Sequence, residues 1–215
     1  MNFKIECMKL LFFLLATFTL FANESHPITT INQWCKEEKA LTEGRYFTFG
    51  TLASVSPSGM PHTRMIEVSH FDKNKGALFF THKSTRKAKD FETNPQASLN
   101  IWLPKTHRQV TLEGTVEEVS RTEAEKSWNR MPRFMKLSFL ASNHSGKLES
   151  EEALQKRKKT LDKEFSKEIP MPDTFIGYRL IPDEVIFYQV NHRSSPTKEG
   201  ALLVEGDWIT SLLEP

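Results

Sequence analysis

Short strand-forming stretches separated by turn residues recur along this chain of 215 residues. Residues 47–55 and 60–68 flank a turn at 56–59 that contains proline and glycine, a pattern that predicts a β-hairpin. In the run 108–119, apolar and polar side chains alternate, which puts Gln109 on the polar face. Such strands must pack their apolar faces inward, and a small barrel does so around a single core.

Further strands and several helices are predicted in the same way. After the hairpin, the expected strands are residues 77–82, 96–103, 108–119, 178–181, 185–190, 201–204 and 208–212. The expected helices are residues 28–41, a segment from Ser84 to about residue 93, and residues 122–129, 134–140 and 151–167. We therefore expect one mainly β domain with α decoration over residues 23–215.

The N-terminus has the pattern of an export signal. Lys4 and Lys9 precede an apolar run over residues 10–22, and the chain becomes polar at Asn23. This run has the length of a signal-peptide core and is short for a membrane span. We expect residues 1–22 to be a removable signal peptide, which implies an exported or periplasmic protein. The alternatives are an uncleaved anchor or a buried N-terminal helix, and the last would leave the protein cytoplasmic.

Charge and cysteine content exclude some classes of function. Acidic and basic residues are interspersed and the formal net charge is +2, which gives no reason to expect a nucleic-acid partner. The two cysteines, Cys7 and Cys35, form neither a disulfide framework nor a metal-binding or redox motif. No metal site is predicted.

A candidate phosphate site lies between two predicted strands. Ser84 and Thr85 stand where a helix is expected to begin, and Arg86 and Lys87 follow them directly. The first backbone N–H groups of a helix lack intrahelical acceptors, and the helix dipole adds positive potential there. Two full positive charges at the same place favour a dianion. The alternative is an ordinary capped surface helix with solvated basic residues.

The order of motifs along the chain resembles the pyridoxamine 5'-phosphate oxidase family of FMN-binding split β-barrels. The resemblance covers nearly everything after residue 26, and an ordered series of this length is more specific than any single motif. The matching segments are residues 27–34, 51–55, 61–66, 79–81, 84–88, 108–110, 131–133, 175–180 and 184–189.

This resemblance implies an oxidoreductase that binds FMN at the interface of a homodimer. In the family, a hydride passes from the substrate to the flavin, which oxygen then reoxidises. The positions that match the family's FMN contacts are Arg64, Phe80, Thr81, Arg86, Lys87, Gln109, Ser145 and Tyr188. Arg64, Arg86 and Lys87 would neutralise the phosphate, and Gln109 would address the polar edge of the flavin ring. Four positions depart from the family pattern, namely Phe80, His144, Tyr188 and Thr197.

The positions that contact substrate in the family are kept less well. They correspond to Ser69, Ser127, Met131, Met135, Arg193 and Ser195, and only Arg193 retains the family's residue. The family's substrates are phosphorylated B6 vitamers, so fewer cations should weaken their binding unless Arg130, Arg133 or Lys136 compensates. The alternatives are a split-barrel oxidoreductase with another small-molecule substrate and a non-catalytic flavin-binding protein. No catalytic residue is assigned.

Overall fold

The structure is a computed structural model that describes residues 26–215 except 45, 143, 145 and 192. The predicted signal peptide therefore lies outside the described residues. The helices are α2 (Pro27–Ala40), α3 (Arg86–Thr93), α4 (Arg121–Arg130), α5 (Arg133–Ala141) and α6 (Glu151–Glu164). The strands are β1 (Phe49–Val55), β2 (Pro61–Glu67), β3 (His70–Asp72), β4 (Gly76–His82), β5 (Gln96–Leu103), β6 (Arg108–Glu118), β7 (Phe175–Gln189), β8 (Thr197–Val204) and β9 (Asp207–Leu213).

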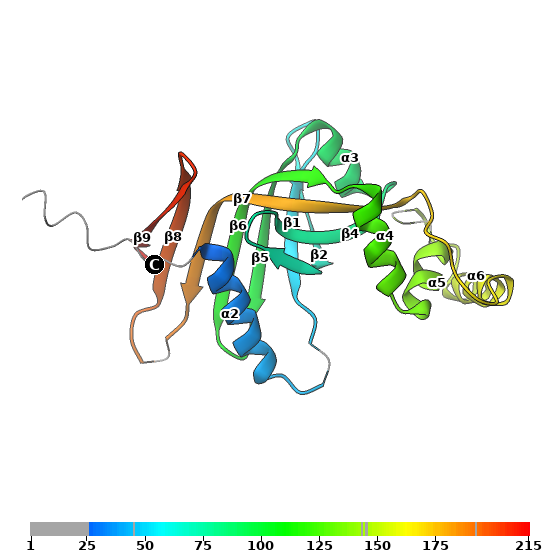
Figure 1. Cartoon of the computed structure of the whole chain (residues 1–215), viewed down its shortest axis with the longest axis horizontal. Helices are drawn as coiled ribbons and strands as arrows, with labels where there is room; N and C mark the ends of the chain where they lie inside the picture. The colour runs from blue at the N-terminus through cyan, green and yellow to red at the C-terminus, as the bar shows by residue number, and fades with distance from the viewer. Residues whose placement is uncertain (1–25, 45, 143, 145, 192) are drawn as a thin grey trace, which may run out of the picture.

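The strands form one antiparallel sheet in the order β2-β1-β5-β6-β7-β4-β3, with β8 beside β7 and β9 beside β8. Strand β7 pairs with β4 over its first residues and with β8 from Glu184 onward. Figure 1 shows the consequence: the β8–β9 hairpin lies at one end of β7, and α4, α5 and α6 lie at the other. The predicted mainly β fold with helical decoration is confirmed.

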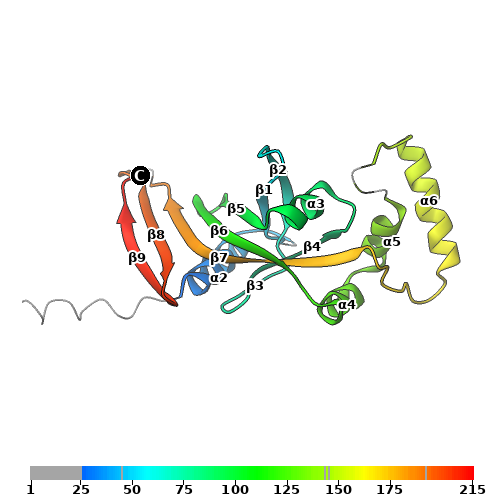
Figure 2. The ribbon, with the colours of Figure 1, turned by 90° about the horizontal axis from the view of Figure 1, so that it is seen from above.

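Two hydrophobic clusters hold this arrangement together. The larger lies within the sheet and includes Ile28 and Ile31 of α2, both fully buried. The smaller forms around Trp128 of α4, whose indole N–H donates to the carbonyl of Ile169 at 2.9 Å. Figure 2 shows α5 and α6 beyond the end of β4, where this second cluster lies. The helical end can therefore form a wall beside the barrel.

The sequence patterns placed most elements within one or two residues of their observed bounds, and four differences stand out. Strand β8 begins at Thr197, four residues before the expected residue 201. Residues 178–181 and 185–190 were expected to be separate strands, but both belong to β7. The short strand β3 was not predicted because three residues carry too little periodicity. Helix α6 ends at Glu164, short of the expected residue 167. No helix in the described part of the chain is long and apolar enough to span a membrane.

The prediction of two strands failed because Pro182 reads as a break in a strand. In the structure, the register of β6 against β7 shifts between Glu113 and Gly114, and Gly114 lies opposite Pro182. A Cβ atom on Gly114 would lie 2.1 Å from the carbonyl oxygen of Ile181. The absence of a side chain at residue 114 therefore lets β7 pass a proline without losing its pairing with β6.

We expect Gly114→Ala to lower the free energy of unfolding by at least about 2 kcal/mol, because backbone atoms must move to admit the methyl group. The control is Gly59→Ala, where a Cβ would meet nothing within 4 Å and only the positive φ of +83° opposes alanine. That change should cost about 1 kcal/mol. Urea unfolding followed by circular dichroism measures both, and equal losses would contradict the role assigned to Gly114.

Candidate functional site

The predicted phosphate segment begins α3, next to the end of β4. The Nζ of Lys87 donates to the hydroxyl of Thr81 at 2.7 Å. Thr85 occupies the N-cap position, but its hydroxyl donates to the carbonyl of His82 at 2.9 Å and does not cap the helix. The first N–H groups of α3 therefore donate no hydrogen bond to this side chain, as the prediction of an anion site requires.

Lys87 lies in an environment that disfavours its own charge. Burial and, to a smaller extent, the positive charge of Arg64 together lower the pKa of its ammonium group to about 8. An anion bound nearby would stabilise the charged form of this ammonium group. The lowered pKa of Lys87 therefore makes this side chain a candidate ligand for an anion.

Arg64 reaches the same region from β2. Its Nη1 donates to the carbonyl of Leu52 at 3.1 Å, and its Nη2 lies 3.8 Å from Oδ2 of Asp90 in α3. Burial lowers the pKa of the Arg64 guanidinium, Asp90 opposes this shift, and Arg86 adds to it. The three predicted phosphate ligands thus influence one another across β2 and α3.

Asp90 is the acidic partner of this group. Its side chain is almost fully buried, and its Oδ2 accepts a hydrogen bond from the hydroxyl of Ser54 at 2.6 Å. The Nδ1 of His62 lies 3.3 Å from the same oxygen. A buried carboxylate is stable only when it is well partnered, so Asp90 fixes the orientation of the groups around it, Arg64 among them.

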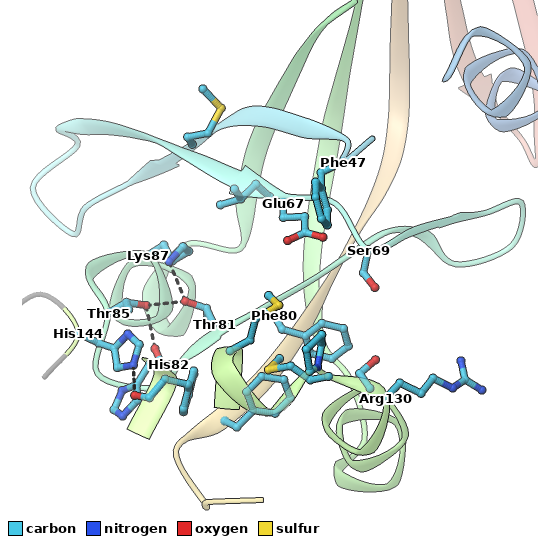
Figure 3. Close-up of a pocket in the computed structure, with 18 of the residues that line it drawn as sticks. Phe47, Glu67, Ser69, Phe80, Thr81, His82, Thr85, Lys87, Arg130 and His144 are labelled. Carbon is cyan, nitrogen blue, oxygen red and sulfur yellow. Dashed lines mark hydrogen bonds between the residues drawn. The ribbon is translucent and has the colours of Figure 1, made fainter. Parts of the chain in front are cut away.

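A cavity of about 600 Å³ opens beside Lys87, between the barrel and the helical end. Phe80 and Thr81 of β4 line it, and the ring of Phe80 stacks on Phe175 with a centroid distance of 5.2 Å. Figure 3 shows Lys87, Thr81, Thr85 and His144 at one end, with Ser69 and Arg130 at the other. Four residues predicted at the substrate positions line the same cavity, namely Ser69, Ser127, Met131 and Met135.

The remaining predicted residues lie elsewhere in the chain. Gln109 of β6 is paired with Tyr188 of β7, and Gln109 donates weakly to Thr111 at 3.4 Å. Thr81 pairs with Ile176, twelve residues before Tyr188 along β7. This separation corresponds to roughly 35–40 Å of strand. The sequence therefore predicted two groups that one copy of the chain does not bring together.

Two further predicted residues fall outside both groups. Arg193 is exposed and follows the end of β7, five residues after Tyr188. Ser145 lies outside the described residues. No group of three or more His, Cys, Asp or Glu side chains that could hold a metal occurs in the described part of the chain.

The sequence did not identify a histidine pair at the polar end of the cavity. The rings of His82 and His144 stack with centroids 4.3 Å apart. Nδ1 of His82 accepts from the backbone N–H of Ser84 at 3.0 Å, and Nε2 of His144 lies 2.8 Å from the carbonyl oxygen of Phe139. Burial lowers the pKa of both rings, and His144 further lowers the pKa of His82. His144 had been noted only as a departure from the family, since two separated histidines carry no local signal.

Comparison of the whole fold gives the class of protein. PhzG from Burkholderia lata, solved in complex with tetrahydrophenazine-1-carboxylic acid, is 26% identical with a TM-score of 0.82, over 92% of this chain and 98% of PhzG. A pyridoxamine 5'-phosphate oxidase-related, FMN binding protein from Nostoc punctiforme has a TM-score of 0.70 at 17% identity, over 87% of this chain and 96% of its own. The second likeness concerns the fold alone. The fold is that of the FMN-binding split β-barrels.

Sequence comparison gives the family. The family described as pyridoxamine 5'-phosphate oxidase matches residues 37–158. The pyridoxine/pyridoxamine 5'-phosphate oxidase of Nostoc punctiforme is 37% identical over 169 residues, 77% of this chain and 78% of the relative. The protein of the same name from Psychromonas ingrahamii is 34% identical over 193 residues, 86% of each chain. The chain belongs to the pyridoxamine 5'-phosphate oxidase family, as its resemblance predicted.

The lowered pKa of Lys87 leads to a pH-dependent prediction. FMN carries a phosphate dianion above neutral pH, and Lys87 loses its proton above about pH 8 when no ligand is bound. FMN affinity should therefore fall by about five- to tenfold between pH 7 and pH 9. Fluorescence titration of FMN at each pH measures this change.

Two controls isolate the lysine. Lys87→Arg keeps its charge throughout this range, so the decline with pH should disappear. Riboflavin lacks the phosphate, and its weaker binding should not change over the same interval. An equal decline for FMN in the wild-type and Lys87→Arg proteins would contradict the assignment of Lys87 to the phosphate.

Proposed function

We propose that this protein is an FMN-dependent oxidoreductase in which Arg64, Arg86 and Lys87 bind the FMN phosphate. One observation carries the proposal: three cations from two elements meet beside the uncapped start of α3. The adjoining cavity of about 600 Å³ is in the size range of cofactor sites. Membership of the family supports the same cofactor.

The residues present fit FMN in their chemistry. Arg64 and Arg86 can form paired hydrogen bonds with phosphate oxygens, and Lys87 adds a compact charge. Phe80 and Thr81 would line the path from the phosphate into the cavity, one with an apolar ring and the other with a hydroxyl. Bound FMN would supply a hydride acceptor that oxygen can reoxidise. The protein's part is to position the substrate and exclude water.

The apolar outer surface supports a homodimer. Phe49, Met65 and Trp102 are between 47% and 67% exposed, an unusual exposure for large apolar side chains on one surface. Met65 lines the cavity and also a groove of about 380 Å³ that includes Phe49 and Trp102. Trp102 pairs with Gln109 across the sheet, so the groove continues toward the second group of predicted residues.

A second copy of the chain placed on this surface would explain the division of the site. The cavity and its cations belong to one end of the fold, whereas Gln109 and Tyr188 belong to the other. In a symmetric dimer the same two surfaces meet twice, so each of two sites can combine both groups. We therefore propose that Gln109, Tyr188 and Arg193 of one copy complete the cavity of the other.

The substrate is a separate question from the cofactor. Pyridoxamine 5'-phosphate is the family's named substrate, and Met131 and Met135 leave two substrate positions without a polar group. PhzG, a structural relative, was solved with a carboxylic acid bound. The second candidate function is therefore a split-barrel oxidoreductase with a different small-molecule substrate.

Purified protein is expected to carry FMN, which its absorption spectrum and release on denaturation would identify. Anaerobic addition of pyridoxamine 5'-phosphate should bleach the flavin slowly, because the substrate positions lack cations. Rapid bleaching at the rate typical of the family would show that Arg130 or another group compensates. Protein free of FMN that also fails to take it up would contradict the proposed function.

Mixing two defective variants tests whether the site is shared between copies. Arg86→Ala/Lys87→Ala removes two of the proposed phosphate cations, and Gln109→Ala removes the β6 side chain that lies opposite the far end of β7. After unfolding and refolding together, heterodimers would contain one intact site, and FMN occupancy should recover to about a quarter of the wild-type value. Refolding each variant alone is the control. No recovery in heterodimers verified by tagged subunits would contradict the shared site.

A further inference from the structure

The end of the cavity away from Lys87 is largely apolar. We call it the distal lobe and define it by Phe47, Glu67, Ser69, Met131, Phe134 and Met135. Phe134 is 60% exposed and Phe47 is 45% exposed, although both line the cavity. Aromatic and thioether side chains offer broad, polarisable contacts to a flat ring. The distal lobe is thus suited to an apolar ring system.

The charged side chains around the distal lobe disfavour the binding of a phosphate. Figure 3 shows the carboxylate of Glu67 turned toward the hollow and the guanidinium of Arg130 directed away from it. Glu67 makes no salt bridge within the described part of the chain, and its pKa is raised because the cavity wall partly buries it. The charged group that faces the interior of the distal lobe is therefore a carboxylate.

A phosphate dianion in the distal lobe would meet this carboxylate, while the nearby cation Arg130 is directed away from the hollow. Lys87 lies at the other end of the cavity, where its ammonium group is bonded to Thr81. Ser69 offers a hydroxyl, and Met131 and Met135 offer only thioethers. A second copy could bring Arg193, but a single arginine would face Glu67 as well as the ligand. Charge complementarity therefore favours a ligand with a hydrogen-bond donor in place of the phosphate.

We propose that the distal lobe selects an unphosphorylated, flat ring compound whose hydroxyl or amino group, in the place of the phosphate, donates to the carboxylate of Glu67. The apolar wall holds the ring, and Glu67 decides which substituent is accepted. The inference rests on the proposed function, because the ring must lie next to bound FMN to be oxidised. It adds to that function the class of substrate and a residue that determines specificity.

Pyridoxamine and pyridoxamine 5'-phosphate are matched probes, because they differ only by the phosphate. Isothermal titration of each into the FMN-loaded protein gives the two dissociation constants. The unmodified protein should bind pyridoxamine at least as tightly as its phosphate ester. A family member whose site binds the substrate phosphate should instead bind the ester at least tenfold more tightly than pyridoxamine, since each charged hydrogen bond adds substantial affinity.

Variants at two positions should move the two affinities in opposite directions. Glu67→Gln removes the charge with little change in shape, and it should weaken pyridoxamine about tenfold while leaving the ester unchanged or tighter. Ser69→Lys adds a cation and should tighten the ester about tenfold with little effect on pyridoxamine. The control is Glu117→Gln on the exposed part of β6, which should change neither.

Three results would overturn the inference: a tenfold or greater preference of the unmodified protein for the ester, no binding of pyridoxamine, or no change in pyridoxamine binding in Glu67→Gln. The first two need no variant and so do not depend on how a substitution folds. Flavin content and anaerobic bleaching report on the proposed function separately. Protein that lacks FMN but keeps the preference for pyridoxamine would contradict the proposed function alone.

Discussion

The close approach of Gly114 to the backbone at Ile181 and Pro182 is the contact on which the architecture depends. It allows β7 to continue through a proline and to remain a single strand of 15 residues. Because β7 is continuous, it pairs with β4 near its start and with β8 near its end. The cavity and the β8–β9 hairpin are thereby fixed at opposite ends of one rigid element.

This arrangement places the predicted site residues in two groups at opposite ends of the fold. The end at β4 and α3 concentrates positive charge, and Asp90 prevents that charge from disrupting the fold by holding Arg64 through a buried ion pair. The end at Gln109 and Tyr188 holds Arg108 in an ion pair with Glu37 and borders exposed aromatic residues such as Trp102. The proposed FMN site takes residues from both parts, which is the reason for proposing that two copies of the chain act together.

The proposed site keeps the cations expected at the cofactor position of the family, whereas the residues at the expected substrate positions differ from the family pattern. Arg64 contacts Asp90 and the carbonyl of Leu52, and Lys87 bonds to Thr81 and is influenced by the charge of Arg64, so each is constrained by more than one neighbour. Met131 and Met135 line the cavity and are only partly buried, and Met131 also packs against the cluster around Trp128. In the function that we propose, substrate preference can shift without loss of the three cations, and Glu67 adds a carboxylate to the end of the cavity away from Lys87.

The sequence by itself determined the strands, most helices and the local phosphate segment, because alternation in residues 108–119 and the order Thr85-Arg86-Lys87 are local patterns. Through motif order it also determined the family. Only the tertiary structure decided that Gln109 lies far from Lys87, that β7 is continuous, and that His82 stacks on His144. These facts depend on strand pairing and on contacts between residues distant in sequence. The local periodicity of a sequence does not reveal such contacts, since each forms only when the whole sheet assembles.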